Sequence, residues 1–203
     1  SFIEPRYETR VSVVYYSDVT LRQGLTVDIR KQPKRPWSIL KLIDVKTLTP
    51  EEVAFLWLVV KYKIPVMIVG EMMSGKTTLA TAILNLIPPK SKVITIEDTP
   101  EIRLCTPYWT RATTRESFEN PVTVFSLLRI AVRLSVDYVV VGEVRGEEAY
   151  VLFQAIATGH SGMTPLPAES IEAAVKRLTS PPMNIPQSYI PLINVVLVIK
   201  RVT

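Results

Sequence analysis

A glycine-rich loop between an apolar run and a helix-forming run constrains the fold of this chain more than any other feature. Residues 70–77 read GEMMSGKT and satisfy the eight-position pattern GxxxxGK[ST]. The preceding residues 65–69 (PVMIV) are short and apolar, as expected of a strand buried on both faces of a parallel sheet. Residues 78–87 have helical apolar spacing and are followed by two prolines, which end a helix. The order strand, glycine loop, helix predicts an α/β fold.

In this arrangement the loop predicts a site for nucleotide phosphates. Its backbone N–H groups and the positive end of the helix would face an anion, Lys76 would reach the β and γ oxygens, and Thr77 would ligate Mg2+. A chance match in an ordinary loop is disfavoured, because the strand and the helix are both in place. The residues expected to contact the phosphates are Gly70, Met72, Met73, Ser74, Gly75, Lys76, Thr77 and Thr78.

Length and composition fit one full domain and part of another. The 203 residues are 47% hydrophobic and 21% charged, which is enough apolar side chain for a large core. Cys105 is the only cysteine, so no internal disulfide forms, as fits a reducing compartment. No apolar stretch reaches the roughly 18 residues of a membrane span, so we expect a soluble chain. The net charge of +5 is modest and favours solvated surface charge over contact with acidic lipid or nucleic acid.

The chain is expected to have two parts joined by a linker. Residues 10–16 and 25–30 look like two strands, too few for an independent fold, so residues 1–33 are predicted to end an N-terminal domain. Prolines and basic residues follow, and we expect a linker at 34–48. Thr49 and Pro50 then predict the start of a helix. Residues 49–203 would form the main domain.

Carboxylates follow two further predicted strands, at the edge where open parallel sheets bind ligands. Residues 92–96 are followed by Glu97, Asp98 and Glu101. These carboxylates could position water, hold Mg2+ through water or act as a base, but spacing alone favours a solvated acidic loop. Residues 137–141 are followed by Glu143. Phosphate-loop enzymes place an acid near Mg2+ and the attacking water in this way. We therefore expect Glu143 to act there, with Thr77 as its companion at the metal.

The positions of arginines and of the single histidine allow two interpretations each. Arg129 and Arg133 lie on a helix expected over residues 123–135 and are either outer-face charges or phosphate-sensing groups. His160 lies in a turn after another predicted helix. A lone histidine forms no multi-histidine metal site and is more often structural than functional.

Four ordered boxes together resemble the secretion ATPase superfamily, which includes the type II and type IV secretion, pilus-assembly and archaellum motors. They are a Walker A loop at 70–77, an Asp box at 94–102 (ITIEDTPEI), an atypical Walker B at 139–145 (VVVGEVR) and a His box at 158–164 (TGHSGMT). The resemblance covers nearly all of residues 10–203, and its wording is closer to the archaeal branch.

The resemblance implies a RecA-like P-loop NTPase domain with a mostly parallel central sheet, preceded by the remnant of an N-terminal domain. It implies a homo-hexamer that hydrolyses ATP with Mg2+ to power secretion or filament assembly. Such a motor is cytoplasmic and peripheral to the membrane, on an integral membrane platform protein. By position, Glu143 is the Walker B glutamate, Glu101 an acid that polarises water, and His160 a γ-phosphate sensor. Arg133 and Arg30 fall on family arginines that approach phosphate.

Two departures from common patterns stand out. Gly142 replaces the aspartate of most phosphate-loop enzymes, as is common in this family. The His box usually ends with a second histidine, but here Pro167 stands at that position, and Pro165 and Pro167 remove two N–H donors from an expected central strand.

The second departure leaves an alternative open, a nucleotide-binding structural or regulatory subunit with weak or no hydrolysis. A DNA-translocating ATPase is supported only by the basic charge and the ring architecture. The chain lacks the interleaved aromatic and basic residues of a strand-binding groove, so no direct nucleic-acid partner is expected.

Overall fold

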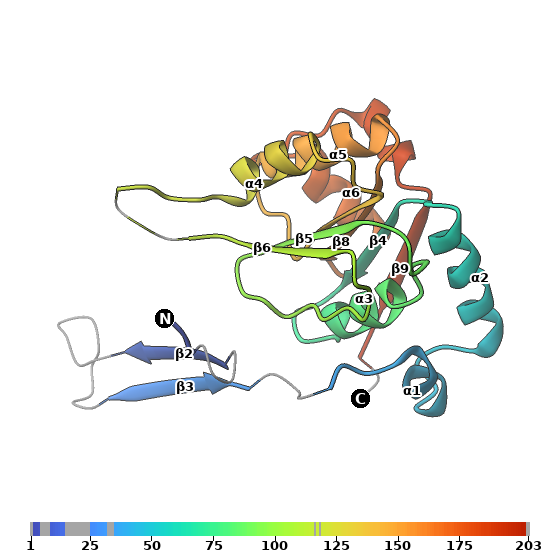
Figure 1. Cartoon of the computed structure of the whole chain (residues 1–203), viewed down its shortest axis with the longest axis horizontal. Coiled ribbons are helices and arrows are strands. Elements are labelled where there is room, and N and C mark those ends of the chain that lie inside the picture. The colour runs from blue at the N-terminus through green and yellow to red at the C-terminus, as the bar shows by residue number, and fades with distance from the viewer. Residues whose placement is uncertain are drawn as a thin grey trace.

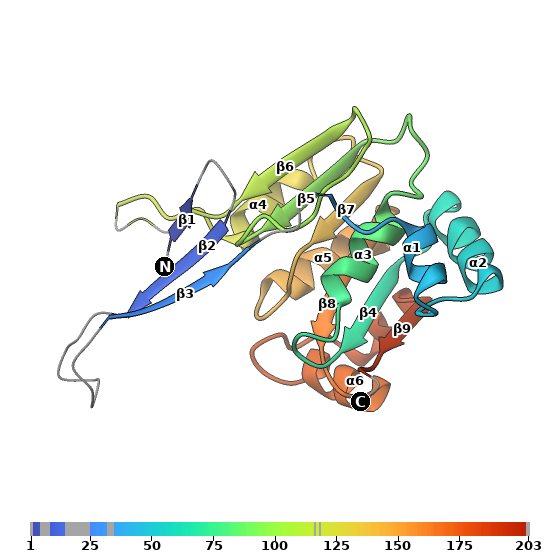
Figure 2. The ribbon, with the colours of Figure 1, turned by 90° about the horizontal axis from the view of Figure 1, so that it is seen from below.

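The computed structural model describes residues 2–4, 9–14, 25–31, 35–115, 117 and 119–201. Most of them form a six-stranded sheet between two layers of helices (Figure 1). The strands are β4 (Val66–Gly70), β5 (Val93–Glu97), β6 (Trp109–Thr113), β7 (Tyr138–Val141), β8 (Ser161–Pro167) and β9 (Val195–Ile199). They lie in the order β6-β5-β7-β8-β4-β9, and every pairing is parallel (Figure 2). This confirms the expected α/β fold.

The helices divide between the two faces of the sheet. One layer contains α1 (Ile39–Asp44), α2 (Pro50–Lys61) and α3 (Lys76–Leu84). The other contains α4 (Val124–Ala131), α5 (Glu148–Ala157) and α6 (Ile171–Thr179), with the 3-10 helix η1 (Gln187–Leu192). Side chains alternate along β4, so that Ile68 packs in the first layer and Val69 in the second. Strands β4, β5 and β7 are buried throughout, which explains their continuous apolar sequences.

Helix α2 begins where its sequence predicts. Thr49 Oγ1 accepts a hydrogen bond from the Glu52 N–H (3.2 Å), and Glu52 Oε2 accepts one from the Thr49 N–H (2.7 Å). This capping box satisfies two N–H groups that the helix itself leaves without partners. The segment 34–48, expected to be a linker, contains α1, whose Leu42 is buried against the core of the main domain. Residues 39–44 are therefore packed against the main domain.

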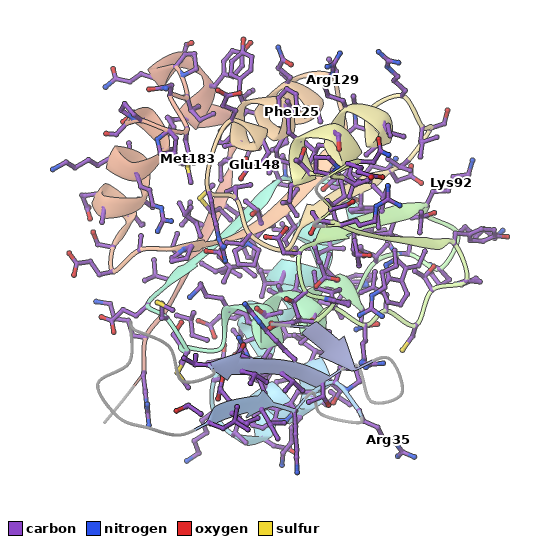
Figure 3. The ribbon with its side chains drawn as sticks, turned by 90° about the vertical axis from the view of Figure 1, so that its left-hand side faces the viewer. Arg35, Lys92, Phe125, Arg129, Glu148 and Met183 are labelled. Atoms are coloured by element: carbon purple, nitrogen blue, oxygen red, sulfur yellow. The ribbon has the colours of Figure 1, made fainter. Side chains whose placement is uncertain are left out.

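A separate antiparallel sheet contains β1 (Phe2–Glu4), β2 (Thr9–Val14) and β3 (Thr26–Arg30), in that order. The expected strand pair is therefore present, with a third strand beside it. Tyr15, Tyr16 and the turn at Gln23 and Gly24 lie outside the described residues. Figure 3 shows the small sheet below the main one. The domain boundaries at residues 33 and 48 stay a prediction.

The prolines of β8 do not interrupt the strand, contrary to the sequence-based expectation. Neighbouring residues of a strand direct their N–H groups to opposite sides. The Ser161 N–H donates to the carbonyl just before β7 (3.0 Å), and the Ala168 N–H donates to the last carbonyl of β4 (3.2 Å). Odd-numbered positions, Pro165 and Pro167 among them, thus face β7, where pairing has already ended at Met163. The missing N–H groups would have had no ladder partner.

Asp137, just before β7, contacts the segments before β4 and before β5. Its carboxylate forms an ion pair with Lys63 and accepts a hydrogen bond from the Lys92 N–H (2.8 Å). Burial raises the pKa of Asp137. The hydrogen bonds from Lys63 and Lys92 together lower it by more, so the pKa of Asp137 lies below its ordinary value. A carboxyl group with a lowered pKa stabilises the fold above the pKa of the unfolded chain, and this contribution is lost as pH falls through the folded-state pKa.

We therefore expect Asp137→Asn to lower the free energy of unfolding by about 1 kcal/mol at about pH 7, and by much less at about pH 2.5. Urea unfolding at both pH values measures this difference. Asp44→Asn is the matched control, because Asp44 has only a 4.0 Å ion pair with Lys41 at the surface. Equal destabilisation by Asp137→Asn at both pH values would contradict the assignment.

Candidate functional site

A cleft of about 1020 Å3 lies at the carboxyl edge of the main sheet. Parallel strands end on the same side, so the residues that follow β4, β5 and β7 meet there (Figure 2). The lining includes the loop before α3, the segment after β5, the segment after β7 and two residues of the small sheet, Arg10 and Arg30. The cleft is therefore bounded by both sheets.

The glycine loop has a backbone conformation that suits an anion. Gly75 has φ +96° and directly precedes α3 without a side-chain cap, so the first N–H groups of the helix have no acceptor from that position. At Gly70 a Cβ atom would stand 2.6 Å from the Ile199 carbonyl oxygen, so only glycine fits. Of the eight predicted phosphate contacts, six line the cleft, namely Met72, Met73, Gly75, Lys76, Thr77 and Thr78. Gly70 and Ser74 do not line the cleft.

Lys76 and Glu143 influence each other across the cleft. The Lys76 ammonium donates to the Glu71 carbonyl oxygen, within the loop. Burial lowers the pKa of Lys76, and the negative charge of Glu143 opposes this effect. The structure therefore brings together the two residues that the sequence had placed at the phosphates and at the metal.

Glu143 is held by an arginine from its own segment. Arg145 Nη2 lies 2.6 Å from Glu143 Oε2, and this hydrogen bond raises the pKa of Arg145. Glu148 at the start of α5, labelled in Figure 3, accepts hydrogen bonds from the Arg145 N–H (2.5 Å) and the Gly146 N–H (2.9 Å). The turn after β7 is thus ordered around Glu143.

Glu101 has an arginine partner from the other sheet. Arg30 Nη2, at the end of β3, lies 3.2 Å from Glu101 Oε1. The Glu101 side chain is 19% exposed and that of Arg30 is 60% exposed, so the pair lies at the mouth of the cleft. Both residues had been predicted separately, and the structure places them in contact.

His160 and Arg133 lie at the opposite edge of the sheet. His160 precedes β8, and its Nδ1 lies 3.2 Å from the Ala155 carbonyl oxygen. Arg133 follows α4, whose first residues, Thr123 and Val124, line the cleft. The helix runs from Val124 to Ala131 and carries the chain about 11 Å along its axis before Arg133. Neither residue lines the cleft, and their inferred roles in sensing or approaching phosphate stay predictions.

Other basic residues line the cleft that sequence reasoning did not assign to it. They are Arg10, Lys31, Arg103, Arg115, Arg145 and Arg177. Arg10 lies opposite Arg30 in the register of β2 and β3, which only the structure shows. Arg177 reaches the cleft from α6, and its Nη1 donates a hydrogen bond to the Pro167 carbonyl oxygen (2.7 Å). No local sequence pattern predicts this contact.

The residues present fit a magnesium ion that is held mainly by phosphate oxygens. Among the described residues, no three His, Cys, Asp or Glu side chains gather into a protein-only metal site. Mg2+ is usually bound through one or two protein ligands together with substrate phosphates and water. Thr77 and Glu143, predicted for this role, both line the cleft.

This architecture defines a RecA-like P-loop NTPase domain, in which β8 separates the loop strand β4 from the acid-bearing strand β7. The chain belongs to the Type II/IV secretion system protein family, whose model matches residues 4–201.

Relatives agree with this assignment. The chain is 47% identical over 158 residues to the uncharacterized protein MJ1287 of Methanocaldococcus jannaschii, covering 76% of this chain and 58% of that protein. It is 40% identical over 191 residues to MJ0900 of the same organism, covering 93% of this chain and 34% of that protein. The type IV secretion system protein PtlH of Bordetella pertussis is 37% identical over 130 residues, 62% of this chain and 38% of PtlH. The chain therefore spans between a third and three fifths of these relatives.

Solved structures show the same fold. The VirB11 ATPase of the Brucella suis type IV secretion system, in complex with sulphate, matches with a TM-score of 0.58 and 27% identity over 91% of this chain and 61% of that one. The pilus retraction motor PilT with bound ADP matches with a TM-score of 0.62 at 22% identity, over 90% and 53% of the two chains. No helix in the described part of this chain combines the length and apolar character that crossing a bilayer requires.

Proposed function

We propose that this chain is the motor part of an ATPase that hydrolyses ATP with Mg2+ and drives secretion or the assembly of a surface filament. The observation that carries the proposal is the common cleft of the Lys76 loop, Glu143 and Glu101 at the carboxyl edge of one parallel sheet. Membership of a family of secretion and pilus ATPases supports it.

Each residue has a chemical task in this proposal. The loop amides and Lys76 bind the phosphates, and Thr77 and Glu143 hold Mg2+, which neutralises phosphate charge when bound. Glu143 and Glu101 orient the attacking water for in-line displacement. Arg30 and Arg145 each contact one of these acids and lie close enough to the cleft to turn towards phosphate.

The ion pair between Arg30 and Glu101 could couple events in the cleft to a movement of the small sheet relative to the main one. It connects the end of β3 in the small sheet with the segment after β5 in the main sheet. Phosphate binding that draws Arg30 inward would shift the small sheet relative to the main one. Closure of this kind is a common way to couple a nucleotide cycle to mechanical work.

The proposed assembly is a homo-hexamer in the cytoplasm, on the cytoplasmic face of a membrane, docked on an integral membrane platform protein. PtlH of Bordetella pertussis and VirB11 of Brucella suis are proteins of type IV secretion systems. Light scattering of the full-length protein with MgATP tests the hexamer, and release of phosphate under the same conditions tests the enzyme. Absence of nucleotide binding would overturn the proposal.

A second candidate function is nucleotide binding with little hydrolysis. The specific observation is Pro167 at the carboxyl end of β8, which lines the cleft without a polar side chain. Tight ATP binding with negligible phosphate release would favour this candidate.

We expect Pro167→His to raise the rate of phosphate release, by about tenfold, because an imidazole at this edge adds a group that can contact phosphate. The exchange leaves the ladder to β4 intact, since position 167 faces β7. Steady-state hydrolysis with matched thermal unfolding measures the effect. Pro186→His, just before η1, is the control at a proline outside the cleft. Unchanged or slower turnover would show that Pro167 does not limit hydrolysis.

A further inference from the structure

Glu97 differs from the other acids around the cleft because it is buried. It is the last residue of β5 and only 2% exposed, whereas Asp98 beside it is exposed. Its sequence position suggested a solvated loop or a ligand for water or metal. Burial of a carboxyl group is unfavourable unless hydrogen bonds or charges compensate, so the contacts of this side chain require an explanation.

One carboxylate oxygen of Glu97 fastens the segment that carries Glu101. Glu97 Oε1 accepts hydrogen bonds from the Glu101 N–H (2.8 Å) and the Ile102 N–H (2.9 Å). Ile102 is fully buried, so this turn is anchored in the core on one side. The backbone of Glu101 is therefore set by Glu97, and with it the start of the side chain that meets Arg30.

The stem of the same side chain packs against the residue before Glu143. A Cβ atom built on Gly142 would lie 3.0 Å from Glu97 Cγ and 3.4 Å from Glu97 Cβ. Gly142 also donates its N–H to the Ile96 carbonyl oxygen (2.8 Å), which extends the β5–β7 ladder by one residue. The absence of a side chain at position 142 thus allows Glu97 to lie across the end of β7.

The carboxylate of Glu97 also has a charged neighbour. Arg111 Nε lies 3.9 Å from Glu97 Oε2, which is an ion pair longer than a hydrogen bond. Burial raises the pKa of Glu97 above its ordinary value, and the amides of Ile102 and Glu101, together with the charge of Arg111, offset this only in part. A leucine or methionine would fill the same volume at lower cost, so packing alone does not account for a carboxyl group at this position.

We infer that Glu97 is the positioning residue for both candidate acids, holding the Glu101 turn through its carboxylate and the Gly142–Glu143 turn through its side-chain stem. The effect on hydrolysis rests on the proposed function, but the coupling between the two turns does not. Glu97 lines the cleft, but in this role it acts through the two turns and not through contact with nucleotide or water. Its contribution is to keep two acids from different strands at a constant separation.

Hydrogen exchange of the full-length protein tests the coupling without reference to activity. In Glu97→Ala, the Glu101 and Ile102 amides should exchange at least about tenfold faster, because both lose their acceptor. In Glu97→Gln the amide oxygen can accept the same two bonds, so exchange should stay near that of the wild type. A peptide from α2, which contains neither of the two turns, is the internal reference. Unchanged exchange in Glu97→Ala would overturn the inference.

A double-mutant cycle with Gly142→Ala gives the sharper test. Alone, Gly142→Ala should displace Glu97 and speed exchange of the Glu101 and Ile102 amides. In the Glu97→Ala background the obstructing Cγ is gone, so Gly142→Ala should add at most about a twofold further change. Independent, multiplicative effects of the two substitutions would overturn the coupling, whatever the activity.

The same variants separate positioning from binding in hydrolysis assays. Glu97→Ala and Gly142→Ala should lower kcat by about tenfold or more while KM for ATP stays near wild type, because the Lys76 loop is untouched. Glu97→Gln should restore most of kcat. Equal activity of all variants would refute the positioning role. If the wild-type protein hydrolyses no ATP but the exchange results hold, the proposed function fails and the coupling stands.

Discussion

Lys76→Ala is expected to reduce ATP-dependent phosphate release by about 10^3-fold or more. Lys76 lines the cleft at the first residue of α3, and its ammonium now donates to the Glu71 carbonyl oxygen within the loop. A phosphate would take the place of that acceptor, and alanine offers no charge to neutralise the transferred group. Phosphate release measured with saturating MgATP gives the size of the loss, and calorimetric titration with ATP gives the loss of affinity.

Lys90→Ala is the matched control for this variant. Lys90 is exposed in the turn before β5, at the opposite edge of the sheet, and does not line the cleft. Both variants should unfold at the wild-type temperature, since neither side chain is part of the core. Turnover by Lys76→Ala at the wild-type rate would rule out this cleft as the site of hydrolysis.

Glu143→Gln is expected to keep ATP binding and to lower phosphate release by about 10^2- to 10^4-fold. The amide has the size of the carboxylate and can still accept a hydrogen bond from Arg145, so the turn after β7 should keep its shape. It can neither attract a proton from water nor contribute negative charge at Mg2+. Single-turnover phosphate release and equilibrium ATP binding, measured on the same preparation, separate the two effects.

Glu51→Gln on the exposed side of α2 is the control for removal of one carboxylate. A loss of ATP binding in Glu143→Gln would show that the contribution of Glu143 to holding Mg2+ and the phosphates outweighs its contribution to orienting the water. Normal phosphate release would remove Glu143 from the mechanism and leave Glu101 as the remaining candidate acid.

In the structure, each of these two acids is paired with an arginine. Arg145 contacts Glu143 at 2.6 Å, and Arg30 contacts Glu101 at 3.2 Å. A carboxylate that binds an arginine is less available to orient water, because its lone pairs are engaged. Under the proposed function, bound phosphate competes for the same arginines, so the presence of substrate itself would free the acids.

Local patterns in the sequence were sufficient for the elements that depend on short-range chemistry. The glycine loop, the apolar β4 and the capped helix α2 each follow from neighbouring residues, because turn geometry, burial on both faces and helix capping act over a few positions. The acids after β5 and β7 were placed at one edge for a similar reason, since parallel strands end on the same side.

Only the tertiary structure decided at which edge of the main sheet the remaining side chains lie and how deeply each of them is buried. His160 precedes β8 and so lies away from the cleft, while Arg177 from α6 reaches into it. Pro165 and Pro167 are tolerated because the N–H groups that they lack would face β7 beyond the last residue with which β7 pairs. Glu97 is buried in a position that Gly142, the residue after β7, leaves open by having no side chain. These outcomes depend on contacts between segments far apart in the chain, and no window of neighbouring residues contains them.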